Sequence, residues 1–239
     1  MYKNNTFLAI IPARGGSKGL HNKNIKELCG KPLIVWSIEA GLQSEYIDEV
    51  IVSTDYRSIA DIAKKHGAYV PFLRPDHLAS DTTTTFDTVK HVIDFYNNEL
   101  KKKFDYIVLL EPTSPLRKDC DIDNMIEKIT NNEDRFDSIV SIGEVHEHPS
   151  IMKKITVDGK LISFCNNLEM ESRRQDNHPA YFPYGVAYIA KTSVLLEDES
   201  FYTKKCDFYK IDRYQCYEID DMYDFLSIEN ILNYKKGEK

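Results

Sequence analysis

The sequence lacks the features that mark several classes of protein. No apolar run approaches the ~20 residues that a membrane-spanning helix needs. The apolar run nearest the N-terminus, Thr6 to Ile11, is too short for a signal peptide. The five cysteines are odd in number and form no Cys-x-x-Cys pair, which favours reduced thiols in a cytoplasm and no zinc site. The net charge of −7 argues against general nucleic-acid binding, so we expect neither nucleic acid nor membrane as a partner.

Acidic residues are absent from the first 26 positions, although the chain as a whole is acidic. The segment 12–26 carries four cationic side chains and three glycines, which are Arg14, Lys18, Lys23, Lys26, Gly15, Gly16 and Gly19. Glycines let backbone N–H groups approach phosphate oxygens, and lysine and arginine neutralise their charge. The segment therefore predicts a polyphosphate-binding loop, with a solvated surface turn as the alternative.

The neighbours of this loop fit a ligand site. Thr6–Ile11 predicts a strand buried on both faces, and Pro32–Leu42 predicts a helix with an apolar stripe. Open α/β sheets bind ligands between such a strand and such a helix. Neither a Walker A loop nor a dinucleotide fingerprint is present, because Lys18 lies between Ser17 and Gly19 and no Gly-x-Gly-x-x-Gly occurs.

Strands and helices alternate along most of the chain. We predict strands at 49–55, 68–73, 105–111, 137–142, 185–190 and 215–219, and helices at 58–66, 82–100, 122–129 and 222–232. This alternation predicts an α/β fold with a doubly wound, mostly parallel, Rossmann-like sheet. Between 144 and 182 the chain is polar with two short strand-like pieces, so we predict a core of residues 1–143 and 183–239 and an inserted arm of residues 144–182.

Three further polar clusters follow predicted strands. In the cluster around Arg74, hydroxyls at 82–85 could read a nucleobase edge, or Asp81 or Thr82 could cap the next helix. In the turn 111–117, prolines shape the chain and leave the roles of Glu111 and Arg117 open.

The last cluster holds two carboxylates. Glu218 and Asp220 would lie about 6–7 Å apart on one face of a strand end, where they could hold Mg²⁺. The alternative is that Asp220 or Asp221 caps a helix.

Together the clusters resemble the parts of a nucleotidyl transferase. Phosphoryl chemistry depends on positioning and charge neutralisation, so it needs no protein nucleophile. The alternatives are a sugar-1-phosphate nucleotidylyltransferase, a non-catalytic nucleotide-binding regulator and a purely structural interaction protein.

Five motifs follow one another along nearly the whole chain. They are Ile11-Pro-Ala-Arg-Gly-Gly-Ser-Lys-Gly19 with Lys23-Asn24, Val52-Ser-Thr-Asp55, Arg74-Pro75 with Leu78-Ala-Ser-Asp81, Pro112-Thr-Ser-Pro-Leu-Arg117, and Glu218-Ile-Asp220. In this order they resemble the N-acylneuraminate cytidylyltransferases, also called CMP-sialic acid synthetases. The related Kdo cytidylyltransferases have a different first loop and match less well.

The resemblance implies a nucleotidyltransferase core with an arm that exchanges contacts across a homodimer. It implies that CTP and a nonulosonic acid give a CMP-sugar and pyrophosphate with Mg²⁺, the anomeric hydroxyl attacking the α-phosphorus. It places catalysis at Arg14, Lys18, Lys23 and Asp220, the nucleotide at Ala13, Arg14, Gly15, Gly16, Ser17, Lys18, Asn24, Arg74, Asp81 and Thr85, the sugar at Glu111, Arg174, Phe182 and Tyr184, and the metal at Glu218 and Asp220.

The sequence departs from the family in its sugar half. Glu111 stands where sialate-specific members usually have glutamine, and Phe182 and Tyr184 replace an arginine and an asparagine. Thr85 replaces a serine and Glu218 an aspartate, whereas Arg174 keeps a basic position that could pair with the sugar carboxylate. We therefore expect a nonulosonic acid as acceptor, with legionaminic acid as the alternative to N-acetylneuraminate itself.

Overall fold

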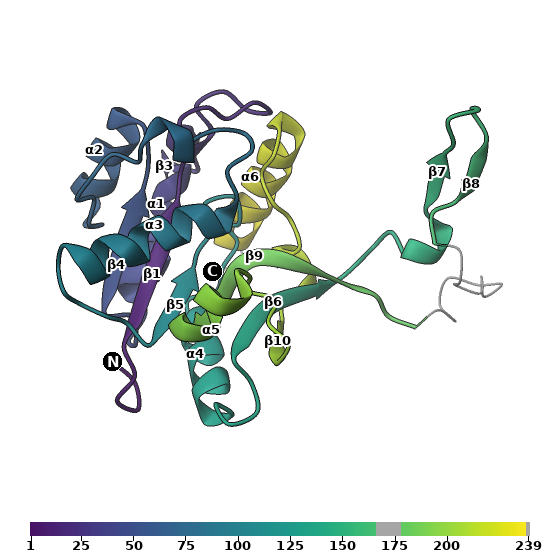
Figure 1. The fold of residues 1–239 in the computed structure, drawn as a ribbon. Coiled ribbons are helices and arrows are strands. Elements are labelled where there is room, and N and C mark those ends of the chain that lie inside the picture. The colour runs from purple at the N-terminus through teal and green to yellow at the C-terminus, as the bar shows by residue number, and fades with distance from the viewer. Residues whose placement is uncertain (166–177, 238–239) are drawn as a thin grey trace.

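A six-stranded sheet, in the order β10-β6-β9-β5-β1-β4, forms the middle of the computed structural model, which describes residues 1–165 and 178–237 (Figure 1). Five of its strands are parallel, and β9 runs antiparallel between β5 and β6. The strands are β1 (Phe7–Pro12), β4 (Glu49–Ser53), β5 (Tyr106–Leu109), β6 (Ser138–Glu144), β9 (Tyr181–Lys191) and β10 (Cys206–Lys210). The predicted doubly wound, mostly parallel sheet is thereby confirmed.

Helices cover both faces of the sheet. The alternation of β1 explains why: Phe7, Ala9 and Ile11 point to one core cluster, and Leu8 and Ile10 point to the other. The first face packs against α1, α2 and α4, the second against α3 and α5, and α6 packs beside α1. These helices are α1 (Leu33–Gln43), α2 (Arg57–Lys65), α3 (Thr85–Asn98), α4 (Asp121–Asn131), α5 (Thr192–Asp198) and α6 (Met222–Gly237).

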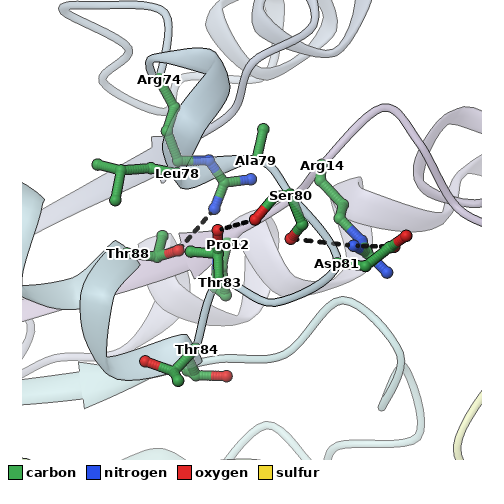
Figure 2. A pocket seen from close by; sticks show the side chains of 11 residues that line it. Pro12, Arg14, Arg74, Leu78, Ala79, Ser80, Asp81, Thr83, Thr84 and Thr88 are labelled. Carbon is green, nitrogen blue, oxygen red and sulfur yellow. Dashed lines mark hydrogen bonds and ion pairs between the residues drawn. The ribbon is translucent and has the colours of Figure 1, made fainter.

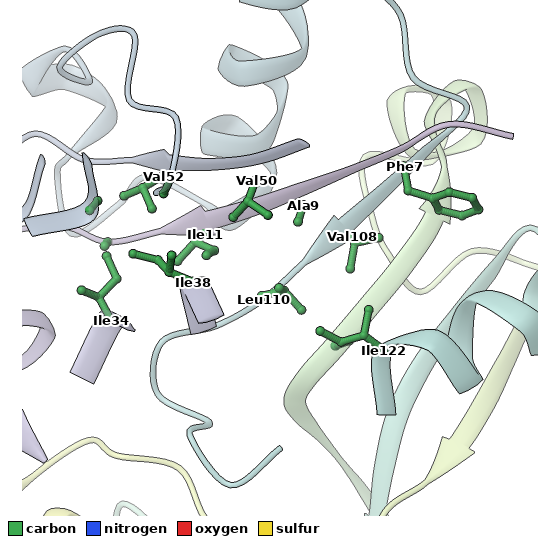
Figure 3. Packing of buried hydrophobic residues seen from close by; sticks show 14 of the residues in the cluster. Phe7, Ala9, Ile11, Ile34, Ile38, Val50, Val52, Val108, Leu110 and Ile122 are labelled. Carbon is green, nitrogen blue, oxygen red and sulfur yellow. The ribbon is translucent and has the colours of Figure 1, made fainter. Parts of the chain in front are cut away.

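Aliphatic side chains fill the first face. Figure 3 shows Ile34 and Ile38 of α1 and Ile122 of α4 packed on the sheet, near Ile11 and Leu110. All five are at most 2% exposed. Full burial of one such side chain contributes roughly 1.5–3 kcal/mol. The apolar runs of the sequence thus fix the sheet from which the polar loops extend.

The structure corrects three predicted elements. Residues 68–73 form no strand, since Pro71 cannot donate to a ladder and only an isolated bridge joins Tyr69 to Ile51. Residues 215–219 are not a strand either, because a 3-10 helix (Arg213–Gln215) leads into irregular chain. Helix α3 begins at Thr85 with Thr84 as its cap, so neither Asp81 nor Thr82 is the cap.

The segment between β6 and β9 extends away from the sheet. It holds a short hairpin of β7 (Lys153–Ile155) and β8 (Leu161–Ser163), which stands apart from the body in Figure 1. The hairpin exposes Ile155, Val157 and Leu161. The remaining short elements lie near the loop after β1 or beside the arm: η1 (Lys23–Ile25), β2 (Glu27–Leu28), β3 (Lys31–Pro32), η2 (Asp76–Leu78) and η3 (Pro149–Ile151).

Two further observations concern the described part of the chain. None of its helices combines the length and apolar character that crossing a bilayer requires. All five cysteines lie within it, and they are free thiols.

Candidate active site

Three adjoining cavities lie at the carboxyl ends of the parallel strands, and Thr85 lines all three. The central cavity, of about 620 Å³, lies between the loop after β1 and the segment 218–220. The threonine cavity, of about 270 Å³, is lined by Arg74 and the hydroxyls of residues 80–88. The aromatic cavity, of about 290 Å³, is lined by Phe86, Tyr188, Phe201 and Tyr202. The predicted clusters therefore meet at one place.

Backbone contacts fix the loop that contains Arg14. The Gly15 N–H donates to Asp55 Oδ1 at 3.0 Å, and Asn24 Nδ2 donates to the Arg14 carbonyl at 3.0 Å. A Cβ on Gly15 would lie 2.8 Å from the Tyr56 ring, so this position requires glycine. Buried Asn24 thus shapes the loop as well as lining the central cavity.

Other predicted loop residues differ in how accessible their backbone N–H groups are to a ligand. The Ala13 N–H donates to the Ser53 carbonyl at 2.9 Å, and Ala13 is buried. Gly16 has open space on its Cβ side, and Ser17 lines the central cavity. The Ser17 N–H donates to the Gly15 carbonyl at 3.0 Å, so the open backbone that could approach a phosphate is found at Gly16.

Asp81 joins the two most accessible cations of the loop. Its carboxylate lies 2.9 Å from Arg14 Nη1 and 2.5 Å from Lys18 Nζ, and Figure 2 shows its pairing with Arg14. The hydrogen bond from Lys18 is the largest cause that lowers the pKa of Asp81. Since a carboxylate repels other anions, Asp81 would influence an anionic ligand through these cations rather than by direct contact.

Arg74 is buried beside the threonine cavity (Figure 2). Its Nη1 donates to Thr88 Oγ1 at 2.7 Å, and its Nη2 lies 3.8 Å from Asp55. Its Nε has no hydrogen-bond partner in the described residues. Burial lowers the pKa of Arg74, opposed by Asp55. A buried cation with an unused donor can bind an oxygen-rich ligand edge.

The basic loop docks on the segment that carries Asp220. Lys23 Nζ donates to the Ile219 carbonyl at 2.8 Å and lies 3.3 Å from Asp220 Oδ1. A Cβ on Gly19 would lie 2.3 Å from the Asp220 carbonyl oxygen. Lys23 and Gly19 therefore determine the position of the Asp220 carboxylate.

Replacing Gly19 by alanine is expected to lower kcat/KM by about 10²-fold, because displacing a reacting group by 1 Å costs that much. The new Cβ would push on backbone, which cannot rotate away as a side chain could. Steady-state kinetics and the melting temperature would be compared with wild type. Unchanged kinetics would show that the loop and Asp220 move apart without consequence.

Glu111 and Glu218 lie on either side of Gly185. A Cβ there would be 2.5 Å from Glu111 and 2.9 Å from Glu218. Glu218 Oε1 accepts hydrogen bonds from Ser114 Oγ at 2.9 Å and from the Gly185 N–H at 2.6 Å. Burial, with a smaller contribution from Glu218, raises the pKa of Glu111 to about 7. The cavity therefore contains a group of carboxylates that repel one another.

The open question of the helix cap is resolved by Asp221. Its carboxylate accepts from the N–H groups of Tyr223 at 2.7 Å and Asp224 at 3.1 Å. The Asp220 side chain is 84% exposed and faces the central cavity instead. Asp220 and Glu218 are thus available to a ligand, although no strand holds them.

The predicted sugar residues are only partly assembled. Glu111 lines both the central and the aromatic cavity. Phe182 and Tyr184 pack edge to face at the base of the arm, with their ring centroids 5.2 Å apart, and line none of the three cavities. Arg174 lies outside the described residues.

The aromatic cavity was not predicted from the sequence. Tyr188 belongs to a strand whose alternation indicates core packing, and Phe201 and Tyr202 follow α5 without a motif. The register of the sheet brings Tyr188 opposite Leu109, two residues before Glu111, but this pairing is visible only in the structure.

Comparisons with known proteins agree with this geometry. The family model for cytidylyltransferases matches residues 8–224. A CMP-N,N'-diacetyllegionaminic acid synthase of Legionella pneumophila is 40% identical over 199 residues, which are 82% of this chain and 83% of that protein. An N-acylneuraminate cytidylyltransferase of Streptococcus agalactiae is 32% identical over 245 residues, which cover 96% of this chain but 57% of that protein. The chain thus spans just over half the length of this second relative.

A solved structure shares the fold. A CMP:2-keto-3-deoxy-manno-octonic acid synthetase complexed with CTP superimposes with a TM-score of 0.71, covering 96% of this chain and 99% of that one, at 15% sequence identity. At that identity the likeness concerns the fold alone. The family model and the 40% identical relative confirm the resemblance found in the motifs. The chain belongs to the cytidylyltransferase family, alongside the N-acylneuraminate cytidylyltransferases, and is a nucleotidyltransferase enzyme.

Proposed function

We propose that this protein transfers CMP from CTP to the anomeric hydroxyl of a nonulosonic acid and releases pyrophosphate. One observation carries the proposal: in the central cavity, Arg14, Lys18 and Lys23 face Glu111, Glu218 and Asp220. Cations on one side suit a triphosphate, and carboxylates on the other suit a divalent cation. The attacking hydroxyl belongs to the acceptor, so the absence of a nucleophilic side chain from this set fits the chemistry.

Arg14 lines both the threonine cavity and the central cavity, and together these two would hold the nucleotide. The threonine cavity would take cytosine, with Arg74 and the N-terminus of α3 at Thr85 supplying donors. The phosphates would then lie in the central cavity, against Arg14 and Lys18. A triphosphate carries more negative charge than the single carboxylate of Asp81, so it would draw both cations away from their pairing with Asp81.

Magnesium fits the carboxylates that are present. Among the described residues, no group of three or more histidines, cysteines, aspartates or glutamates could hold a metal by itself. Mg²⁺ usually takes one or two carboxylates and completes its shell with phosphate oxygens and water. Asp220 is exposed, and both hydrogen bonds that Glu218 accepts from the described residues go to Oε1, which leaves Oε2 for a metal, so these two would hold it. When bound, it would neutralise phosphate charge and activate the acceptor hydroxyl.

The acceptor would occupy the aromatic cavity, which opens on the central cavity at Thr85 and Glu111. Its walls are mostly apolar, with Phe86, Tyr188 and Phe201 among them. Such walls suit acyl groups and a deoxygenated tail better than the glycerol chain of N-acetylneuraminate. We therefore favour a legionaminic acid as acceptor, which is also what the 40% identical relative is named for.

The arm is proposed to form a homodimer. Its hairpin exposes Ile155, Val157, Leu161 and Phe164, an unusual amount of apolar surface for a segment that stands apart from the body (Figure 1). A second copy of the chain would cover this surface. The mass of the protein in solution tests this, since a monomer at micromolar concentration would contradict it.

The acceptor is tested by pyrophosphate release from CTP and Mg²⁺ with a panel of acids and one sugar 1-phosphate. We expect kcat/KM for N,N'-diacetyllegionaminic acid to exceed that for N-acetylneuraminate by about tenfold or more. Glu111→Gln restores the residue usual in sialate-specific members, and should move the ratio toward N-acetylneuraminate. Equal or better turnover of N-acetylneuraminate by the wild type would refute the assignment, and activity confined to the sugar 1-phosphate would refute the proposed reaction.

A further inference from the structure

We propose that Arg117, which lines none of the three cavities, is the positioning residue that fixes the carboxylates of Glu111 and Glu218 and supplies their counter-charge. The proposal rests on the proposed function in one respect, that Glu218 serves the metal. The sequence left the role of Arg117 open. Its hydrogen bonds now define it.

The guanidinium of Arg117 uses all five of its N–H groups on neutral oxygens. Nε donates to the Val186 carbonyl at 2.5 Å. Nη1 donates to Ser37 Oγ at 2.8 Å and to the Ser114 carbonyl at 2.7 Å. Nη2 donates to the carbonyls of Glu111 and Gly185, both at 2.7 Å. Arg117 therefore ties α1, the turn after β5 and strand β9 to a single group.

Two of these partners go on to hold Glu218. Ser114 and Gly185 each accept from Arg117 through their carbonyls, and each donates to Glu218 Oε1, through Oγ and through N–H. The Glu111 carbonyl is held in the same way and also accepts from Ser37 Oγ at 3.1 Å. One mostly buried side chain thus sets the backbone positions from which both carboxylates project.

The charge of Arg117 matters as well as its hydrogen bonds. Glu111 and Glu218 repel each other, and the attraction of Arg117 opposes the rise in the pKa of Glu111. Arg117 offsets the repulsion without donating a hydrogen bond to either carboxylate. A lysine or arginine in direct contact would instead occupy the oxygens. Glu218 Oε2 and the Glu111 carboxylate stay available to a ligand because the counter-charge acts at a distance.

The test measures the dissociation constant of CTP by calorimetry, without acceptor, once in Mg²⁺ and once in EDTA. The ratio of the two constants gives the gain in affinity due to the metal. Ser114→Ala removes one hydrogen bond to Glu218, and Arg117→Lys keeps the charge but cannot supply five fixed donors. We expect the gain to fall by about 10-fold and 10–100-fold respectively, with CTP affinity in EDTA within about 2-fold of wild type.

Met125→Ala serves as the matched control, because it weakens the core beneath α4 without touching the network. It should lower the melting temperature and keep the full gain from Mg²⁺. A wild-type gain in both Ser114→Ala and folded Arg117→Lys would overturn the proposal, as would an equal loss in EDTA or the same loss in Met125→Ala. If Arg117→Lys does not fold, Ser37→Ala takes its place, because it removes a side-chain partner of Arg117 that also donates to the Glu111 carbonyl, and a full gain from Mg²⁺ in it would overturn the proposal.

The proposed reaction and the proposed role of Arg117 can fail independently. A wild type that gains affinity from Mg²⁺ but releases no pyrophosphate with any acid would sink the proposed reaction and still allow the variants to be compared. A wild type that releases pyrophosphate while folded Arg117→Lys keeps the full gain would sink the role of Arg117 alone. A wild type with no gain at all would overturn it directly.

Discussion

Replacement of Lys18 by alanine is expected to lower kcat by about 10²–10³-fold, the usual loss when one preorganised charge is removed from a transition state. The Lys18 side chain is 77% exposed, lines the central cavity and forms an ion pair with Asp81. Nothing in the core rests on it, so the melting temperature should stay within about 2 °C. Pyrophosphate release and thermal unfolding measure the two effects separately.

Lys26→Ala is the matched control for this variant. Lys26 lies on the same basic segment, but it packs 5.3 Å above the Phe225 ring and lines none of the three cavities. The Lys26→Ala variant also removes one positive charge from the loop. Its kcat should change less than about 3-fold, because charges that lie outside the cavity are screened by salt. Similar losses in the two variants would mean that general attraction by the loop, and not Lys18 itself, stabilises the phosphates.

The Asp220→Asn variant should lose Mg²⁺-dependent activity by about 10²-fold or more, because an amide oxygen carries no charge for the metal. Its stability should be almost unchanged: the side chain is 84% exposed, and its contact with Lys23 is long, at 3.3 Å. Initial rates over a range of Mg²⁺ concentrations, together with thermal unfolding, provide the measurement. Wild-type rates at every Mg²⁺ concentration would remove Asp220 from the metal site.

Asp221→Ala should show the opposite behaviour. Its carboxylate caps α6, so its loss should cost about 0.5–2 kcal/mol of stability. Activity at a temperature well below unfolding should stay close to wild type. The pair thus separates two neighbouring aspartates by function, and identical phenotypes would show that the two cannot be assigned different roles.

Strand prediction succeeded where the chain is buried on both faces. The runs at β1, β4 and β5 are continuous apolar segments because helices cover both sides of them. Strand β10 was missed, because its exposed residues include the apolar Phe208 while its buried residue is the charged Asp207, which reverses the usual alternation. The prediction of a strand at 215–219 was wrong because apolar Ile219 is buried by packing near α6 and not by strand pairing.

The site was predictable to the extent that its residues form local motifs. The basic loop follows β1, a strand that the sequence predicts, and such strand ends bind ligands in open sheets. The threonine-rich segment and the carboxylates instead lead directly into α3 and α6, helices that the sequence also predicts. The aromatic cavity depends on contacts between residues far apart in sequence, such as Leu109 and Tyr188, which no local pattern encodes. Phe182 and Tyr184 were assigned because they stand where the family has an arginine and an asparagine, and such a correspondence does not determine which way a strand turns its side chains.

The register at the root of the arm has a practical consequence. Glu144 and Tyr181 are direct partners in the antiparallel ladder of β6 and β9, as are Gly143 and Phe182. A two-residue turn inserted between Glu144 and Tyr181 would close that ladder as an ordinary hairpin. Such a shortened chain would keep the strand that carries Gly185, and would allow the nucleotide chemistry to be studied without the arm that we propose to form a dimer.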